Sequence, residues 1–413
     1  MKLLYTVQRY GEEIVGGSEA ACRQFAEHLV QRGHQVEVVT SCARSYVDWA
    51  DEYEPGTTEI NGVLVHRLPV TERRSMEKSG PLNDWTLMGP RPIPLFQQQR
   101  WMRLMGPQLT GYPTWLRTHA AQTDVVIHMT YLYASTTMGL PITSGLVPTI
   151  LQPTAHDEPA IWVRQCDTLF RLADAFMFFT AEERQTVADR FDFEPDGEVI
   201  GMGMEIHPHA DETSFRRRFE LGDRPYLLYV GRIDTAKGVV EAFRFFEAYK
   251  VRNPGPLLLL FAGDAVFDLP EHDDVMHVGF LDEDLKRSAL AGCLALLQPS
   301  YFESFSIVLC EAWLQGRPAL VQGLSDVLAG QARRSGGALP YSGFAEFEAA
   351  LDLIVDDPAF ADRMGQSGRR YVERSYNWPT VIDGVERAAE LAQRNFASRA
   401  SSKRPRRTEH PTA

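Results

Sequence analysis

Long apolar runs are missing from this sequence of 413 residues. The longest run, residues 257–262, is far shorter than the roughly 20 apolar residues that a membrane-spanning helix needs. Residues 1–7 are too few for a signal peptide and continue into an expected strand. We therefore expect a cytoplasmic protein, with at most peripheral contact at the inner face of the membrane.

Cysteine and positive charge are both scarce. The chain has five cysteines without a C-x-x-C pair, at positions 22, 42, 166, 293 and 310. We expect free thiols and no structural zinc site. The formal net charge of −13 argues against nucleic acid as the main partner, because a phosphate backbone requires a basic surface.

What the sequence does contain is typical of a globular α/β protein. It has 44% hydrophobic and 23% charged residues, and its length exceeds one typical core, so we expect two domains. The opening pattern predicts a strand over residues 3–7, a helix over 19–32 that ends at Gly33, and a strand over 36–40. This βαβ beginning indicates a parallel sheet covered by helices.

The loop between the first strand and the first helix contains Gly16-Gly17-Ser18. Two glycines allow a ligand to approach the backbone closely, and Ser18 is a candidate N-cap of the helix. A plain tight turn fits the two glycines equally well.

Three segments are expected to be irregular. Residues 81–94 are rich in proline and glycine and are interpreted as a loop. Residues 207–223 are polar and charged and are interpreted as an interdomain linker. Residues 397–413 are interpreted as a disordered basic tail.

His156-Asp157-Glu158 follows a predicted strand over residues 147–152. Open α/β sheets bind ligands at the carboxyl ends of their strands, so His156 is a candidate active-site residue. The alternative is that His156 only caps a helix or hydrogen-bonds a backbone carbonyl. His128 lies inside an apolar strand and is interpreted as structural.

The second half of the chain restarts with a predicted strand over residues 226–230, followed by the segment GRIDTAKG at 231–238. Arg232 and Lys237 lie on a loop that enters a helix, where they can hold a diphosphate from two sides. A solvated loop is the alternative, although two cations near a helix N-terminus oppose the helix dipole unless an anion binds.

The segment YFESFSIVLCEA, residues 301–312, is the most informative of the chain. It predicts a tight loop that holds Glu303 and a helix that carries Glu311. Ser304 or Ser306 is a candidate N-cap, and the free N–H groups of this helix end can bind an anion. Acidic residues near a helix start are also favoured by the dipole alone. Two carboxylates beside an anion site suit a ligand with hydroxyls and phosphates, as in a nucleotide-sugar.

Asp282-Glu283-Asp284 has the Asp-x-Asp spacing that can hold a divalent metal ion. Here it precedes an apolar helical pattern, and acidic residues at a helix N-terminus explain it fully. We expect no metal site.

Four elements, in this order, resemble the retaining GT-B glycosyltransferases of family 4, also called glycosyl transferases group 1. They are the glycine pair, His156, Arg232 with Lys237, and two glutamates seven residues apart with Ser-Phe-Ser after the first. The resemblance covers roughly residues 1–396. It implies an α/β protein of the GT-B fold, with two Rossmann-like domains facing each other across an interdomain cleft.

The resemblance also implies the domain limits. We expect an acceptor-side domain over residues 1–205 and a nucleotide-sugar-binding domain over residues 206–378. A C-terminal helix over residues 379–396 is expected to pack back on the first domain.

Roles for single residues follow from the same resemblance. Arg232 and Lys237 would bind the donor diphosphate. Glu303 would face the donor sugar and Glu311 the ribose, while His156 would lie near the donor sugar. The remaining implied donor-binding positions are Gly16, Gly17, Gly279, Phe280, Leu281, Ser304, Phe305, Ser306 and Ile307.

The implied activity is transfer of a sugar from a nucleotide-diphosphate donor to a hydroxyl acceptor, with retention and without metal or cofactor. Cell-envelope polysaccharide or glycoconjugate synthesis is the expected setting, with a sugar, a lipid-linked molecule or a small molecule as acceptor. A nucleotide-sugar epimerase of the same fold and a non-catalytic nucleotide-sugar-binding subunit are the alternatives. Donor base, donor sugar, acceptor, linkage and oligomeric state stay open.

Overall fold

The computed structural model describes residues 1–14, 16–89 and 93–402. The chain divides into two compact units. Unit 1 comprises Met1–Ile200 together with the residues from Ile382 onward, and unit 2 comprises Gly201–Val381. The second division falls within helix α16 (Trp378–Ser402). The expected domain limits after residues 205 and 378 lie close to these divisions in the sequence.

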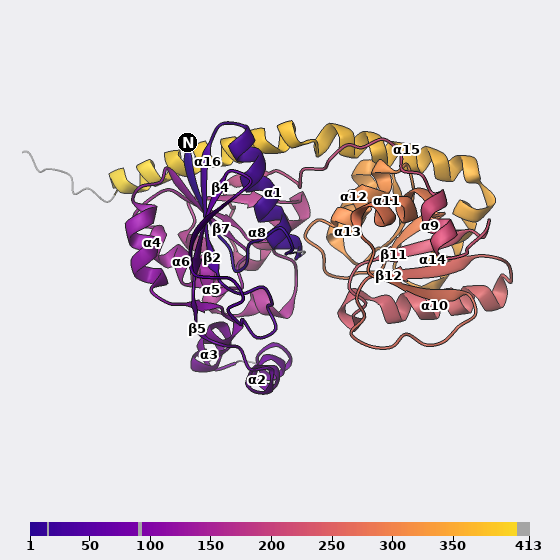
Figure 1. Ribbon diagram of the computed structural model, residues 1–413, viewed down its shortest axis with the longest axis horizontal. Coiled ribbons are helices and arrows are strands. Elements are labelled where there is room, and N and C mark those ends of the chain that lie inside the picture. Colours follow the sequence, from indigo (N-terminus) through magenta and orange to yellow (C-terminus); the bar gives the residue numbers. More distant parts are fainter. Residues whose placement is uncertain (15, 90–92, 403–413) are drawn as a thin grey trace, which may run out of the picture. The chain divides into compact units, whose positions relative to one another are not determined.

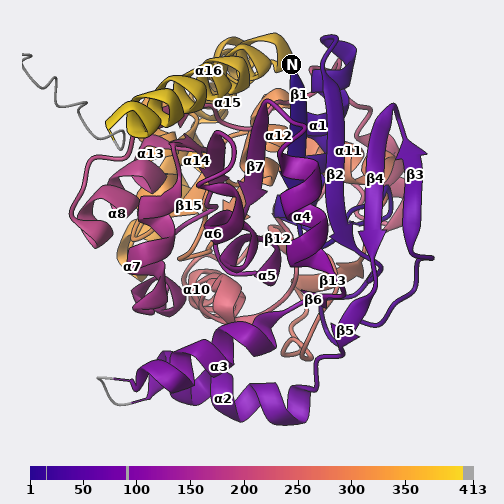
Figure 2. The same cartoon turned by 90° about the vertical axis from the view of Figure 1, so that its left-hand side faces the viewer.

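Unit 1 is built around an eight-stranded sheet (Figures 1 and 2). Neighbouring strands are parallel, except that β3 is antiparallel to β4. In sheet order the strands are β10 (Gly197–Val199), β9 (Ala175–Phe178), β8 (Thr149–Gln152), β7 (Val125–Met129), β1 (Lys2–Thr6), β2 (Gln35–Ser41), β4 (Val63–Leu68) and β3 (Gly56–Ile60).

Helices cover both faces of this sheet. Figure 1 shows α4 (Tyr112–Ala120) and α6 (Gly139–Thr143) on one side, and α1 (Gly17–Gln31) and α8 (Ala181–Phe191) on the other. The central strands β1, β7, β8 and β9 are therefore almost completely buried, which explains their continuous apolar runs.

Helix α2 (Met76–Met88) replaces part of the loop that was expected over residues 81–94, and helix α3 (Leu95–Met105) begins directly after that segment. The prediction was wrong because packing outweighed composition: Leu82 of α2 is buried in one cluster with Trp101 and Met102 of α3. Residues 90–92 of the expected loop lie outside the described residues.

Helix α16 continues to Ser402, so residues 397–402 are helical and the expectation of a disordered tail was wrong there. The side chain of Arg399 forms an ion pair with Asp174 at 2.8 Å, and Asn395 donates to the Asp174 carbonyl oxygen at 2.8 Å. The Asp174 carboxylate is almost fully buried and therefore needs a cationic partner. Residues 403–413 of the expected tail lie outside the described residues.

Unit 2 contains a second sheet, of six parallel strands. In sheet order these are β13 (Val275–Gly279), β12 (Leu258–Ala262), β11 (Tyr226–Val230), β14 (Ala295–Gln298), β15 (Ala319–Gln322) and β16 (Ala338–Tyr341). Helices α10 (Val239–Arg252) and α14 (Phe344–Asp356) pack on one face, and α11 (Glu283–Gly292) and α12 (Ile307–Leu314) lie on the other (Figure 1). Two further helices, α13 (Asp326–Ser335) and α15 (Pro358–Ser375), complete unit 2.

The expected linker over residues 207–223 contains a helix, α9 (Thr213–Arg218). Phe215 is fully buried against Tyr226, with ring centroids 5.7 Å apart, and its N–H group donates to Ser288 Oγ at 3.1 Å. This one buried aromatic ring anchors an otherwise polar segment in unit 2, so the interpretation as a plain linker was wrong.

The structural role predicted for His128 is confirmed. Its two ring nitrogens lie 2.9 Å from Thr6 Oγ1 and 2.8 Å from Thr143 Oγ1, and the residue is completely buried. Burial lowers the pKa of His128 to about 3, so the ring is neutral near pH 7. All five cysteines are buried free thiols, as expected. No helix of the described residues is long and apolar enough to cross a membrane.

Candidate active site

The predicted site residues of unit 2 lie near the point where the strand order of its sheet changes direction. Strand β11 pairs with β12 on one side and with β14 on the other. After β11 the chain continues to β12 on one side, and after β14 it continues to β15 on the opposite side. Ligands of open α/β sheets bind at the carboxyl ends of strands at such a point. The loop after β11 begins at Gly231 and the loop after β14 begins at Pro299.

The loop after β11 is organised by Asp234. Its Oδ1 accepts a hydrogen bond from the Ala236 N–H group at 3.0 Å and caps the short helix η3 (Thr235–Lys237). Its Oδ2 pairs with Arg232 Nη2 at 2.9 Å. Asp234 therefore holds Arg232 and the turn that carries Lys237 in a fixed relation.

Lys237 and Glu303, predicted separately from the two loops, are brought together by the fold. Lys237 Nζ lies 2.9 Å from Glu303 Oε1. The Lys237 side chain is 36% exposed and the Glu303 side chain 14%, so the ammonium group stays accessible while the carboxylate is largely enclosed. An ion pair with one exposed partner contributes little to stability and can be exchanged for a ligand at small cost.

Gly238 brings the two loops into contact. Its φ angle is +73°, and a Cβ atom there would lie 2.2 Å from the Pro299 carbonyl oxygen. Only glycine satisfies both conditions, because it adopts left-handed φ without strain and lacks the clashing atom. The backbone that follows Lys237 therefore lies directly against the loop that carries Glu303.

The N-terminus of α12 differs from the prediction. Ser306 stands at the N-cap position with φ +70°, but its hydroxyl makes no capping hydrogen bond in the described structure. Instead, Ser306 Oγ accepts from Gln298 Nε2 at 2.8 Å, which ties this turn to the end of β14. Phe305 is buried and packs edge-on against Tyr376, whereas Ile307 is the first residue of the helix. Capping by the Ser306 hydroxyl was thus a wrong expectation.

Glu311 lies in the second turn of α12 and pairs with Lys286 of α11 at 2.8 Å. Lys286 also contacts Glu283 at 2.9 Å. Burial lowers the pKa of Lys286, but the two carboxylates outweigh burial and raise it above its ordinary value, so the ammonium group is charged. Sequence reasoning missed Lys286, because a lysine on a polar helix surface has no distinguishing local pattern.

The loop over residues 279–281 leads from β13 into the helix that carries Lys286. Within it, Phe280 is 65% exposed and Leu281 is buried. Asp282 caps α11, because its Oδ1 accepts from the Leu285 N–H group at 2.8 Å. The helix-start interpretation of this acidic segment is therefore confirmed. Among the described residues, no three His, Cys, Asp or Glu side chains are grouped to hold a metal ion.

In unit 1, the two predicted glycines differ in their surroundings. A Cβ atom at Gly16 would lie 2.5 Å from Glu19 Oε2 and 2.9 Å from Arg9 Nη2, within a buried ion pair, so packing explains this glycine. A Cβ atom at Gly17, the first residue of α1, would have no atom of the described residues within 4 Å. The open space at Gly17 favours close approach of a ligand.

Ser18 does not cap α1. The helix begins at Gly17, with Gly16 at the N-cap position, so Ser18 already lies within its first turn. Its hydroxyl donates to Glu19 Oε2 at 2.8 Å and accepts from Gln8 Nε2 at 3.3 Å. The predicted cap was wrong because the helix starts before Ser18.

His156 lies in the loop that follows β8 and is partly exposed. Its Nδ1 is 3.4 Å from Glu158 Oε1, and that same oxygen accepts from the Tyr131 hydroxyl at 2.7 Å. Asp157 accepts from Trp162 Nε1 at 2.7 Å, so its carboxylate is used within the loop. Glu158 therefore contacts His156 directly, whereas Asp157 bonds to Trp162.

Glu183 stabilises the loop that contains His156. Sequence reasoning did not single out Glu183 as a site residue. The residue is buried, and its two carboxylate oxygens accept from the N–H groups of Ala155 and Phe179, each at 2.7 Å. Burial raises the pKa of Glu183 to about 8, against the lowering effect of these N–H groups. The only sequence signal for it is the Thr180-x-x-Glu183 spacing of a capping box.

The raised pKa of Glu183 predicts a pH effect on stability. The folded protein binds more protons at Glu183 than the unfolded chain does, so its contribution is complete below about pH 4.5 and is lost as the pH rises through 8. Between pH 5 and 8 we expect the wild type to lose a few kcal/mol relative to Glu183→Gln, as measured by urea unfolding. The neighbouring Glu182→Gln should behave like the wild type. A pH-independent difference between wild type and Glu183→Gln would contradict this prediction.

Comparison with known proteins places this chain in a family. A model of the family "Glycosyl transferases group 1" matches residues 211–371. Glycogen synthase of Mycobacterium tuberculosis is 30% identical over 429 aligned residues, which cover 95% of each chain. Sucrose-phosphate synthase from Thermosynechococcus elongatus matches with a TM-score of 0.66 at 17% identity, covering 96% of this chain and 99% of its own. Anabaena HepE, solved with UDP-glucose, matches with a TM-score of 0.63 at 13% identity, covering 97% and 100%.

The fold is therefore GT-B, as predicted. The chain belongs to the glycosyl transferases group 1 family, and it is a glycosyltransferase.

Proposed function

We propose that this enzyme transfers a sugar from a nucleotide-diphosphate donor to a hydroxyl acceptor, with retention of the anomeric configuration and without a metal ion. The observation that carries the proposal is the contact between Lys237 and Glu303 beside Arg232, at the point where the strand order of the sheet of unit 2 changes direction. The Anabaena protein with UDP-glucose bound supports the donor class. Cell-envelope polysaccharide or glycoconjugate synthesis is the setting that we propose.

The leaving diphosphate is stabilised by two cationic side chains that the fold positions before the reaction begins. Arg232 and Lys237 are each paired with one carboxylate at 2.9 Å, and both side chains are partly exposed. A diphosphate carries more charge than one carboxylate, so it would attract both side chains. Positive groups placed in advance where charge develops are a main source of catalysis, and here they take the role of a metal ion.

Glu303 and Glu311 orient the two sugar rings of the donor. Glu303 is enclosed and would accept hydrogen bonds from hydroxyls of the transferred sugar. Lys286 contacts Oε1 of Glu311, so the second oxygen of that carboxylate can accept from the ribose hydroxyls. His156 and the open backbone at Gly17 are the candidates for ligand binding within unit 1.

Retention follows from attack on the face that the diphosphate leaves. The bond from the anomeric carbon to the diphosphate oxygen breaks, and the acceptor oxygen bonds to that carbon on the same face. The acceptor proton passes to the departing diphosphate oxygen. This route needs no carboxylate nucleophile below the anomeric carbon, and Glu303 is paired with Lys237.

Donor binding is tested with Glu311→Ala. We expect UDP-, GDP- or ADP-glucose to raise the melting temperature of the wild type, because a ligand of the folded state stabilises it by mass action. Removing the ribose contact should weaken that donor about 10- to 100-fold, the value of one charge-assisted hydrogen bond. Glu348→Ala, which breaks an ion pair with Arg252 elsewhere in unit 2, is the matched control.

Two outcomes would count against the proposal. If no nucleotide-sugar stabilises the folded wild type, the donor class is wrong. If a donor binds but the product shows the inverted anomeric configuration by NMR, the donor class is correct and the retaining mechanism is wrong.

A further inference from the structure

Unit 1 contains a pocket that takes no part in the function proposed above. Its volume is about 780 Å³, within the range of about 300–1,000 Å³ that is usual for small-molecule sites. Residues of β5 (Val70–Glu72), α3, β6 (Gln108–Leu109), α6 and α7 (Gln165–Leu169) line it. None of the candidate active-site residues is among them.

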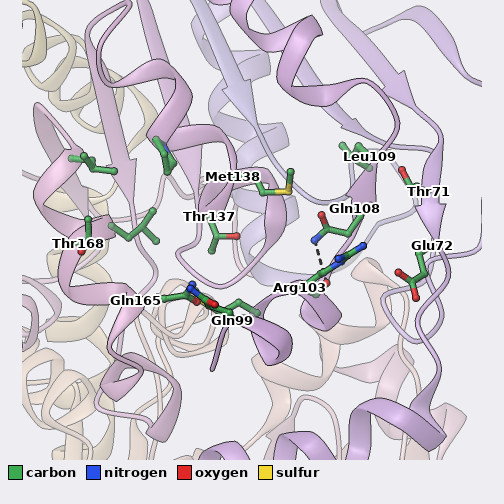
Figure 3. Close-up of a pocket in the computed structure, with 14 residues that line it drawn as sticks. Thr71, Glu72, Gln99, Arg103, Gln108, Leu109, Thr137, Met138, Gln165 and Thr168 are labelled. Carbon is green, nitrogen blue, oxygen red and sulfur yellow. Dashed lines mark hydrogen bonds between the residues drawn. The ribbon is translucent and has the colours of Figure 1, made fainter. Parts of the chain in front are cut away.

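The pocket is lined by apolar and polar side chains (Figure 3). Met102, Leu109 and Leu169 are buried apolar residues of its lining. In Figure 3, Gln99, Thr137, Gln165 and Thr168 lie at one end, and Thr71, Glu72, Arg103 and Gln108 lie at the other, with Met138 between them.

One polar atom of this pocket lacks a partner. Gln165 Oε1 is shielded from solvent and accepts no hydrogen bond from the described residues. A buried acceptor left without a donor costs about 1–3 kcal/mol. Rotation of the Gln165 amide group would turn this oxygen toward the pocket, and a ligand hydroxyl there would supply the missing donor.

The charges of the lining define the ligand further. Arg103 and Glu72 are its one basic and one acidic side chain, so the pocket offers no excess of positive charge to a phosphate or carboxylate. The other polar groups are amides and hydroxyls, which both donate and accept hydrogen bonds. Such groups match a neutral molecule that carries several hydroxyls.

We propose that this pocket binds a neutral sugar of one or two rings. The hydroxyl edges of the rings meet the glutamine and threonine side chains at the two ends, and one hydroxyl donates to Gln165 Oε1. The C–H faces of the rings lie on Met102 and Met138. This inference is independent of the donor and of the retaining mechanism, because it uses only residues of the pocket.

The test is equilibrium binding of maltose and trehalose by calorimetry, with glucose 6-phosphate as the charged comparison. We expect at least one neutral sugar to bind, and Gln165→Leu and Thr137→Val each to weaken it about tenfold, the effect of one lost hydrogen bond. Gln122→Leu, an exposed glutamine at the end of α4, is the control and should bind like the wild type.

Each outcome decides the inference. Absence of binding by both sugars, equal binding by wild type and both pocket variants, or a preference for glucose 6-phosphate would overturn it. The melting temperature of each variant is measured in parallel, without ligand and with the nucleotide-sugar that stabilises the wild type. A wild-type melting temperature with lost sugar binding shows a folded variant with a defective pocket, and a normal response to the nucleotide-sugar separates this pocket from the donor site. A lowered melting temperature in one variant shows misfolding, and the other variant then decides.

Discussion

Lys237→Met should lower kcat about 100- to 1,000-fold, which is the loss that follows removal of one group placed to stabilise a developing negative charge. Lys237 is suited to this role because it is partly exposed, lies on a short helical turn and is held by Glu303 at 2.9 Å. The KM for the donor should change less than kcat, because the added charge on the diphosphate appears only as the sugar leaves.

The melting temperature separates this effect from misfolding. A half-exposed ion pair contributes about 0–1 kcal/mol, so Lys237→Met should melt within a few degrees of the wild type. Arg252→Met removes a comparable ion pair, the one with Glu348, from the same unit and should leave kcat unchanged. If Lys237→Met retains kcat within a few-fold, the charge of the leaving group is stabilised elsewhere and the assignment of Lys237 is wrong.

Gly238→Ala should destabilise unit 2 by about 2–4 kcal/mol, in part because a residue with a Cβ atom pays roughly 1–2 kcal/mol for left-handed φ. The remainder comes from the new Cβ atom, which would lie 2.2 Å from the Pro299 carbonyl oxygen and must push the two loops apart. Because Gly238 directly follows Lys237, the same shift should move Lys237 away from Glu303 and lower kcat as well.

Gly255→Ala is the matched control for this variant. Gly255 has no left-handed φ, and a Cβ atom there would meet nothing within 4 Å. Urea unfolding should therefore give Gly255→Ala a stability within about 0.5 kcal/mol of the wild type. Equal stability of Gly238→Ala and the wild type would show that the two loops are not packed rigidly and that their contact does not position Lys237.

The ion pairs of unit 2 also explain how the cations of the candidate site are positioned. Arg232, Lys237 and Lys286 each contact a carboxylate. These contacts keep the cations near the strand ends and prevent them from folding away into solvent. Donor binding would then exchange carboxylates for phosphates at Arg232 and Lys237, while Lys286 keeps Glu311 oriented for the ribose.

The local sequence by itself determined much of this protein. The alternation of strands and helices, the positions of Arg232 and Lys237 after one buried strand and of Glu303 after another, and the structural role of His128 were all predicted from local pattern. This was possible because buried parallel strands need continuous apolar runs, and because ligand residues follow the carboxyl ends of such strands. The resemblance to a family then depended on four short motifs in a fixed order.

Only the tertiary structure decided which residues meet. Lys237 contacts Glu303, and the Glu183 carboxylate accepts a hydrogen bond from the loop that contains His156. Both contacts join segments that are far apart in the sequence. Two helical segments depend on contacts of the same kind. Helix α2, in a segment whose composition predicted a loop, is buried against α3, and the end of α16 pairs with Asp174. The free energy that stabilises these contacts and helical segments comes from burial against partners that the strand order of the sheets brings close. Local composition does not encode that strand order.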